Sequence, residues 1–365
     1  MIHRDNRYIK LFSMLSFYYF LFFAIIGNYV IIFPKYLTTI GFSTWEIGII
    51  FASMPIARFL FPFIYFRRTL SKNDYLLSIS ISMMAPLLLL SQNLYLIILS
   101  LFLIGGGFSI AFPYVEAIAI EKLGNRYGKS RLFGSIGFIV VGISFSYMHI
   151  NPVYLFIGLI SMLSLCGLYF LNDNTITFNN EPLDLMRYWW FWAMLILVEI
   201  SFGGYYDFFT IYNLNHGISK ENIGWIWVIG SLAEIFIFIL QYKFISIFPP
   251  MSWVKLSVFI TSFRWLILYL FPGNLEVVIL VQILQAISFA IFHTANLIFI
   301  NQIYENKTLA QQFYAGIAYG LAEFSGSIIA GLLFNHYLFL FESLFALAGF
   351  IILVYGSNKM KIKSN

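Results

Sequence analysis

Residues 95–120 read YLIILSLFLIGGGFSIAFPYVEAIAI, and Glu116 is the one charged residue in this stretch. A helix needs about 20 predominantly apolar residues to cross the hydrocarbon core of a bilayer. The length and composition of the stretch therefore predict a membrane-spanning helix.

The whole chain has the same character. Of its 365 residues, 61% are hydrophobic and 10% are charged, whereas soluble domains carry roughly 25% charged residues. This composition excludes a water-soluble globule and a disordered chain. The net charge of +5 is not gathered into one stripe, so nucleic acid is not an expected partner. The single cysteine, Cys166, excludes an internal disulfide and a cysteine-based metal site, and no cofactor is expected.

Twelve apolar stretches separated by loop residues predict an all-α membrane protein with twelve spans. The predicted spans are 11–33, 45–66, 75–91, 95–120, 131–149, 153–171, 189–212, 221–244, 253–271, 276–302, 311–334 and 338–356. Loop residues such as Pro34 and the pair Pro249 and Pro250 mark the breaks. The longest polar stretch predicts a division into an N-terminal six-helix bundle (1–171), a cytoplasmic linker (172–188) and a C-terminal six-helix bundle with a short tail (189–365).

The basic residues predict the orientation of these spans. If the N-terminus is cytoplasmic, only Lys35 and Lys220 of the 21 lysines and arginines fall in outer loops. Arg58 and Arg264 fall deep inside spans, and all the others lie in inner loops, in tails or at the inner ends of spans. Because cytoplasmic loops are enriched in basic residues, we expect both termini in the cytoplasm.

An internal repeat supports two related halves. Residues 41–48 read GFSTWEIG and residues 217–224, which follow at an offset of 176 residues, read GISKENIG. Each copy ends a predicted outer loop and begins a span, with Ser43 or Ser219 as the N-cap. At the same offset, Arg58 corresponds to Glu234. Parallel repeats of this kind are typical of major facilitator transporters, whose substrate site lies near the bilayer midplane.

Among the ionisable residues inside the predicted spans, eight are the main functional signal. They are Arg58, Glu116, Glu199, Asp207, Glu234, Arg264, His293 and Glu323. A charge at the bilayer centre costs at least about 2.5–3.5 kcal/mol on insertion scales, so such residues pair or line a wet pathway. Buried pairs that only fix helix packing are the alternative, above all for Glu199, Asp207 and Glu323.

The tenth span carries a polar stripe. Gln282, Gln285, His293 and Asn296 share one narrow face of a regular helical wheel. The stripe is expected to face the protein interior together with the embedded residues Glu234 and Arg264. A buried glutamate whose contact with an arginine is made and broken can take up and release a proton, so Glu234 is the first candidate for proton coupling.

A second cluster is predicted around the loop between the fourth and fifth spans. Glu116 and Arg131 lie on consecutive antiparallel helices and can meet. Arg131 could instead be an ordinary basic residue of an inner loop. Phe138, Tyr205 and Tyr206 lie near the embedded polar groups in sequence and are candidate aromatic contacts for a solute.

These residues carry a family resemblance across all twelve spans. The chain resembles the 3-phenylpropionate permease-like (MFS-1-like) branch of the major facilitator superfamily, which is related to lactose permease and to nucleoside:proton symporters. The matching stretches are Ala57-Arg58-Phe59-Leu60, Tyr127-Gly128-Lys129, Arg131-Leu132-Phe133-Gly134-Ser135, Tyr205-Tyr206, Ala233-Glu234, Arg264-Trp265 and His293.

The resemblance implies roles for single residues. Glu116 and Arg131 match sugar-binding positions of lactose permease, and Glu234, Arg264 and His293 match its proton-coupling set. Phe138 stands where lactose permease has a tryptophan that stacks on the sugar, and Asn296 stands where it has a proton-binding glutamate. The second difference shifts the expected proton site to Glu234.

We therefore expect a proton-coupled symporter of the bacterial inner membrane that imports a small organic solute, such as the aromatic acid 3-phenylpropionate. Arg58 could hold a solute carboxylate or pair with an embedded glutamate. A sugar or nucleoside symporter and a drug efflux antiporter are the alternatives. No motif of a zinc protease, a serine hydrolase or a phosphate-binding loop occurs, so an enzyme is not expected. A monomer suffices for this fold.

Overall fold

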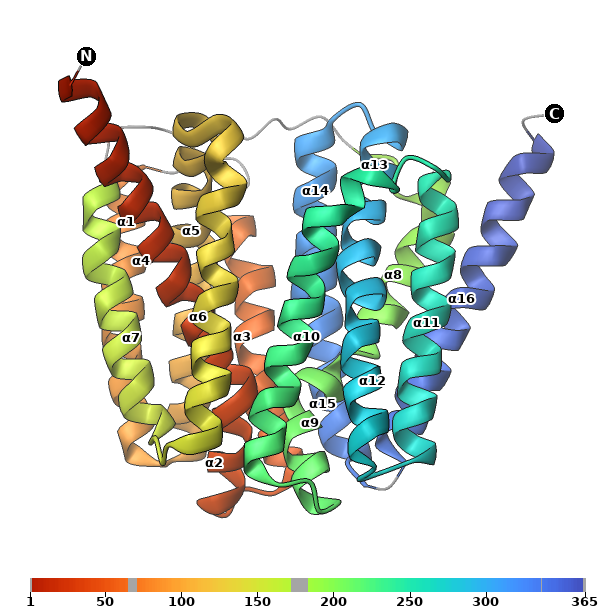
Figure 1. Ribbon diagram of the computed structural model, residues 1–365, viewed down its shortest axis with the longest axis horizontal. Coiled ribbons are helices and arrows are strands. Elements are labelled where there is room, and N and C mark those ends of the chain that lie inside the picture. The colour runs from red at the N-terminus through yellow and green to blue at the C-terminus, as the bar shows by residue number, and fades with distance from the viewer. Residues whose placement is uncertain (1, 65–70, 172–182, 336, 364–365) are drawn as a thin grey trace. The chain divides into compact units, whose positions relative to one another are not determined.

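The computed structural model describes residues 2–64, 71–171, 183–335 and 337–363, which form helices and connections without a strand (Figure 1). The α-helices are α1 (Ile2–Gly27), α2 (Phe33–Thr39), α3 (Thr44–Ile64), α4 (Lys72–Met84), α5 (Leu94–Leu123), α6 (Tyr127–Tyr147), α7 (Pro152–Gly167), α8 (Trp189–Ile200), α9 (Gly203–Asn215), α10 (Lys220–Leu240), α11 (Pro250–Leu270), α12 (Leu275–Gln285), α13 (Phe292–Ile303), α14 (Lys307–Gly316), α15 (Glu323–Leu333) and α16 (Leu338–Lys363). Three π-helical segments join consecutive α-helices: η1 (Asn28–Ile32), η7 (Ala286–Ile291) and η8 (Ile317–Ala322).

Twelve helical segments of the described chain are long and apolar enough to cross a membrane. They are Tyr8–Thr39, Thr44–Pro62, Lys72–Ser91, Leu94–Leu123, Tyr127–Tyr147, Pro152–Phe170, Met186–Asn215, Lys220–Lys243, Pro250–Leu270, Leu275–Ile303, Leu309–Leu333 and Leu338–Asn358. Each overlaps one predicted span, which confirms the all-α fold with twelve membrane helices. Four of the segments combine two α-helices, as α8 and α9 do in Met186–Asn215.

Two compact units make up the described chain. Unit 1 is built from Met1–Phe42, Ile56–Phe178 and Lys220–Val228, and unit 2 from Ser43–Pro55, Asn179–Ser219 and Ile229–Asn365. The start of α3 thus packs with unit 2 and the start of α10 with unit 1. Most of the predicted linker, residues 172–182, lies outside the described residues, and the boundaries of the two predicted bundles stay a prediction.

The last glycine of each repeat copy lies at a close helix contact inside one unit. In unit 2, a Cβ on Gly48 would lie 2.9 Å from the Gly331 Cα, so α3 approaches α15 closely. In unit 1, a Cβ on Gly224 would lie 2.4 Å from the Gly142 carbonyl oxygen, so α10 approaches α6 in the same way. The repeat therefore marks equivalent packing positions in the two units.

The first repeat copy also begins its helix as predicted. The Glu46 N–H donates to the Ser43 hydroxyl over 3.3 Å, and Glu46 Oε2 accepts from the Ser43 N–H over 2.8 Å. This reciprocal capping box satisfies two backbone donors that the first turn of a helix leaves free. Ser43 is therefore confirmed as an N-cap.

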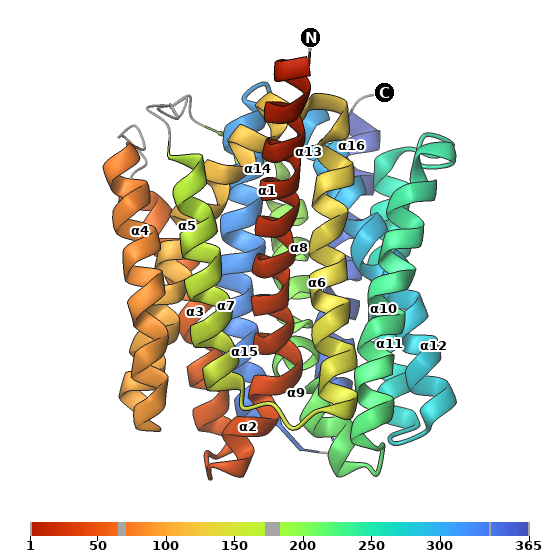
Figure 2. The same ribbon diagram turned by 60° about the vertical axis from the view of Figure 1, so that its left-hand side comes forward.

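In unit 1, α1 lies between α6 and α7 (Figure 2). The contact between α1 and α6 depends on small residues, because a Cβ on Gly137 would lie 2.1 Å from the Phe20 carbonyl oxygen. The Ser16 hydroxyl donates to Ser130 Oγ over 3.1 Å at the same contact. Close packing without bulky side chains lets backbones approach and adds van der Waals contact.

In unit 2, an aromatic group surrounds the start of α9. The fully buried Trp265 ring lies 5.3 Å from the ring centres of both Phe202 and Tyr205. A Cβ on Gly203 would lie 2.3 Å from the Gly326 carbonyl carbon, so α9 begins directly against α15.

Two predicted helix boundaries are wrong. The first span does not end before Pro34, because this proline occupies the first turn of α2. Backbone N–H groups in the first turn of a helix have no partner within the helix, so a proline there costs no hydrogen bond. The helical segment therefore continues to Thr39. The seventh span is not one continuous helix over 189–212. Its α-helices are separated at Ser201 and Phe202, where the Phe202 N–H bonds the Glu199 carbonyl in a tighter turn, and α9 extends to Asn215.

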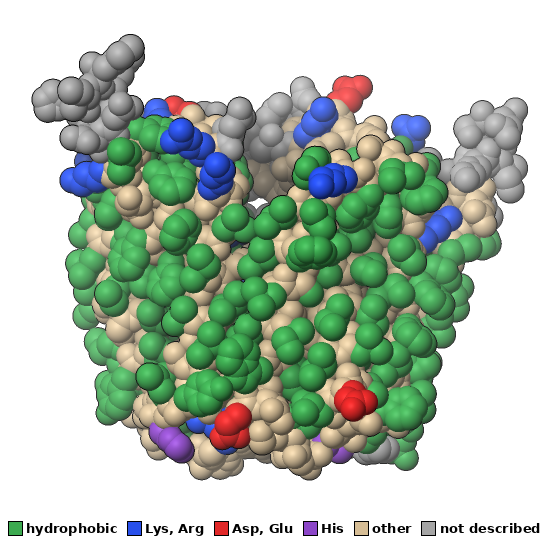
Figure 3. Space-filling model, in the orientation of Figure 1, with side chains coloured by type: hydrophobic (Ala, Val, Ile, Leu, Met, Phe, Trp, Pro, Cys, Tyr) green, Lys and Arg blue, Asp and Glu red, His purple; other side chains and the backbone are tan. Residues whose placement is uncertain are grey.

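The surface agrees with a membrane location. In Figure 3, each unit has hydrophobic side chains over its middle, and blue basic side chains gather near one of its ends. In unit 1, Lys122 and Arg126 lie where α5 ends and α6 begins, the same end of the helices from which α1 starts. In unit 2, Lys243 and Lys307 lie at the end where α16 finishes. The assignment of these ends to the cytoplasm stays a prediction.

Candidate functional site

In unit 1, the helices α1 and α6 bring polar side chains to the carboxylate of Glu116 on α5. Tyr19 of α1 donates to Glu116 Oε2 over 3.0 Å, and Tyr127 at the start of α6 donates to Oε1. Arg131 Nε lies 3.6 Å from Glu116 Oε1. The structure thus brings Glu116 and Arg131 together, as their positions on consecutive helices indicated.

The Arg131 guanidinium also lies among aromatic rings. Its central carbon is 4.5 Å from the ring centre of Phe23, 5.1 Å from that of Tyr19 and 5.2 Å from that of Phe112. Tyr19 and Phe23 are four residues apart and so share one face of α1. The Arg131 side chain is 33% exposed, so its partners do not enclose it completely.

Two further candidates lie elsewhere in unit 1. Phe138 is half-buried on α6, and its ring meets that of Trp227 edge-to-face at 6.0 Å. Arg58 is half-buried on α3. The role of each as a solute contact stays a proposal.

In unit 2, Arg264 of α11 is fully buried. Its Nε donates to the Val281 carbonyl over 2.9 Å, and Nη1 donates to the Ser288 hydroxyl. The guanidinium lies 4.5 Å from the Trp265 ring centre and 5.3 Å from that of Tyr205. Nη2 has no hydrogen-bond partner among the described residues. A buried, unmatched donor on a cation favours an anionic or water ligand.

Glu234 of α10 belongs to the same cluster. Its half-buried carboxylate bonds the Gln285 side chain and lies within electrostatic range of Arg264. Tyr205 donates to the neighbouring amide oxygen of Gln282 over 2.9 Å. The predicted grouping of Glu234, Arg264 and two glutamines is therefore seen, although Arg264 donates to Val281 and Ser288 instead of to the carboxylate.

His293 faces a different part of unit 2. Its Nδ1 lies 2.8 Å from the Tyr319 hydroxyl and 3.4 Å from the Tyr314 hydroxyl. The regular helical wheel predicted for this span is wrong, because the π-helical segment η7 separates Gln285 from His293 and turns the chain by less per residue. Asn296, in the next turn, is fully buried.

The remaining candidates of unit 2 lie on α8, α9 and α15. Glu199 of α8 is buried and lies within electrostatic range of Glu323 on α15. Tyr206 stacks on Phe202 at 5.7 Å, and its hydroxyl is in electrostatic range of both Glu199 and Glu234. Asp207 is 2% exposed, in the second turn of α9.

Glu342 of α16 was not among the predicted site residues. It is 4% exposed, and its Oε1 accepts from the Gly204 N–H at the start of α9. The signal in the sequence was a lone carboxylate near the start of the last span. The tyrosines that bond Glu116 and His293 were also missed, because their partners come from other helices.

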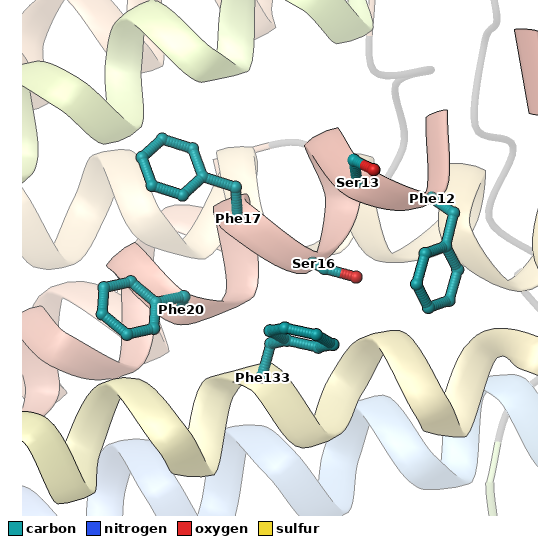
Figure 4. Close-up of a pocket in the computed structure, with 6 residues that line it drawn as sticks. All are labelled: Phe12, Ser13, Ser16, Phe17, Phe20 and Phe133. Carbon is teal, nitrogen blue, oxygen red and sulfur yellow. The ribbon is translucent and has the colours of Figure 1, made fainter. Parts of the chain in front are cut away.

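An open pocket lies apart from these clusters, between α1 and α6 (Figure 4). It has a volume of about 340 Å³ and is lined by Phe12, Ser13, Ser16, Phe17, Phe20 and Phe133. None of the predicted site residues lines it. Within the described chain, no three His, Cys, Asp or Glu side chains are placed to hold a metal ion.

Comparison with known proteins adds the family. Residues 12–345 match the model of the MFS_1 like family. The chain belongs to this family. A curated relative, the probable 3-phenylpropionic acid transporter of Escherichia coli (strain K12), is 26% identical over 346 residues, which cover 87% of this chain and 90% of the relative.

Solved structures share the family's fold. The nucleoside transporter NupG superposes with a TM-score of 0.76 at 17% identity, over 96% of this chain and 99% of that one. The POT family transporter PepTSo gives 0.75 at 9% identity, over 98% of each chain. The MFS_1-like protein is thus a multi-pass membrane transporter of the major facilitator type, and its relatives named here are transporters and not enzymes.

Proposed function

We propose that this MFS_1-like protein is a proton-coupled symporter that imports a small aromatic acid, such as 3-phenylpropionate, across the inner membrane by alternating access. The observation that carries the proposal is Arg131, a partly exposed guanidinium among three aromatic rings with a carboxylate 3.6 Å away. The name of the Escherichia coli relative, a probable 3-phenylpropionic acid transporter, supports the same solute class.

An aromatic acid suits this arrangement at both ends. Its carboxylate can form charge-assisted hydrogen bonds to Arg131. Its ring can pack against Phe23 or Phe112, which already flank the guanidinium. The solute carboxylate would then replace Glu116 as the partner of Arg131, while Tyr19 and Tyr127 continue to donate hydrogen bonds to Glu116.

The proposed proton step takes place in unit 2. Glu234 is a half-buried carboxylate bonded to an amide, and the nearby Arg264 has one unmatched donor. A change in the separation of Glu234 and Arg264 alters how strongly the carboxylate holds a proton. His293, with Tyr314 and Tyr319, is the proposed second member of the coupling set.

A sugar or nucleoside is the second candidate solute. Glu116 already accepts from two hydroxyl groups, Tyr19 and Tyr127, so its carboxylate is suited to a hydroxyl-rich solute as well. Drug efflux by antiport is a further alternative, which the direction of proton movement distinguishes.

The test is solute-driven proton movement in liposomes that contain the purified protein. Inward proton movement on addition of 3-phenylpropionate would support the proposal. The same signal with a sugar or nucleoside alone would replace the solute class, and outward movement would indicate antiport. No response to any solute from a folded protein would contradict proton symport of these solutes.

Glu234→Gln tests the proton step separately. The amide keeps the hydrogen bond to Gln285 but cannot ionise, so uphill uptake should be abolished while counterflow exchange is retained. Glu276→Gln, at an exposed glutamate of α12, is the matched control and should leave both unchanged. Uphill uptake by Glu234→Gln would show that coupling does not require this residue.

A further inference from the structure

The start of α9 is held by a carboxylate from the last span. Glu342 Oε1 accepts from the Gly204 N–H, one of the backbone donors that the first turn of a helix leaves free. The other oxygen, Oε2, is buried and has no hydrogen-bond partner among the described residues. Capping requires only one of the two carboxylate oxygens, so it does not account for the burial of Oε2.

A second carboxylate lies beside it. Asp207 is three residues after Gly204 and so shares its face of α9, and it is electrostatically coupled to Glu342. Arg264 on α11 is the other charged group in range. The helices α8 and α15 also pack against α16, but their carboxylates, Glu199 and Glu323, are not among the charged neighbours of Glu342.

We propose that Glu342 and Asp207 form a proton-binding site distinct from Glu234, in which one proton is held on Glu342 Oε2 and shared with the Asp207 carboxylate. Two carboxylates in one buried site do not both ionise readily. The partial positive charge at the start of α9, together with Arg264, stabilises one negative charge there. The pair therefore keeps one proton, on the Glu342 oxygen that accepts no hydrogen bond from the described residues.

This proton controls the break between α8 and α9. Loss of it at alkaline pH places two negative charges at the start of α9, and their repulsion displaces the first turn of the helix. That turn carries Tyr205, which donates to Gln282, and Tyr206, whose hydroxyl is in electrostatic range of Glu234. Transport should therefore fail at alkaline pH even in exchange mode, a consequence that rests on the proposed function.

Infrared spectroscopy of the protein in lipid vesicles tests the site without any solute. The wild-type protein should show a buried protonated-carboxyl band that disappears on alkaline titration. Glu342→Gln should lose this band, and Glu276→Gln should keep it. In Asp207→Asn the Glu342 carboxyl should give up its proton at lower pH, because the neighbouring negative charge is gone. An unchanged spectrum in folded Glu342→Gln, or an unchanged titration in Asp207→Asn, would overturn the proposal.

Exchange measured against pH tests the consequence. Glu342→Gln keeps a neutral cap on Gly204, so it should keep exchanging solute at alkaline pH where the wild-type protein stops. If Glu342 is a structural cap alone, the two pH profiles will coincide. The infrared result does not depend on proton symport. The proposed proton site and the proposed function can therefore be contradicted independently of each other.

Discussion

At the scale of single residues, the candidate site of unit 1 combines charge and aromatic surface. Arg131 contacts Glu116 and three rings. A lysine would keep the charge but lose the planar guanidinium, which stacks on rings and binds a carboxylate with two parallel hydrogen bonds. The difference separates a solute-binding arginine from an ordinary basic residue of an inner loop.

Arg131→Lys should weaken solute binding by about tenfold, since a cation–π contact contributes about 0.5–2 kcal/mol and the bidentate contact is lost as well. Arg131→Ala should abolish binding. Isothermal titration of the purified variants measures both. Lys129→Ala, two residues earlier on α6 and exposed, is the matched control and should bind normally. Normal binding by Arg131→Ala would show that Arg131 does not bind the solute and is an ordinary basic residue of an inner loop.

At the scale of helices, glycine positions set which helices can touch. Gly137 permits the contact of α1 with α6, and that contact holds Arg131 beside Tyr19 and Phe23. By contrast, nothing lies within 4 Å of a Cβ added to Gly158 on α7.

Gly137→Val should destabilise the protein by at least about 1–3 kcal/mol, because the added carbons meet the rigid backbone at Phe20. Gly158→Ala should be neutral or stabilising by up to about 1 kcal/mol, since alanine favours a helix over glycine. Thermal unfolding in detergent measures both. Equal unfolding temperatures for the two variants would contradict the close contact.

At the scale of the whole molecule, the distribution of basic residues predicts the topology. Both termini should be cytoplasmic, which places the start of Leu275–Ile303 outside and its end inside. Glu276 is the second residue of this span and Glu305 follows its end by two residues, and both side chains are exposed.

A matched pair of cysteine variants tests this topology. Cys166 is the only cysteine, so Cys166→Ser provides a cysteine-free background. In intact cells, a membrane-impermeant maleimide should label Glu276→Cys and leave Glu305→Cys unlabelled, whereas broken cells should label both. The reverse pattern would invert the predicted orientation.

The sequence by itself determined the class of protein, the number of spans and most of the embedded charges, because the bilayer imposes a length and an apolar composition that each span must meet alone. It also indicated Glu116 with Arg131, since a short loop forces consecutive helices to meet. Only the tertiary structure decided the partners of His293, the π-helical shift that separates it from Gln285, the break after α8 and the capping role of Glu342. Each of these features depends on how helices that are distant in sequence pack together. The pattern of residues within one span does not indicate which other helix packs against that span.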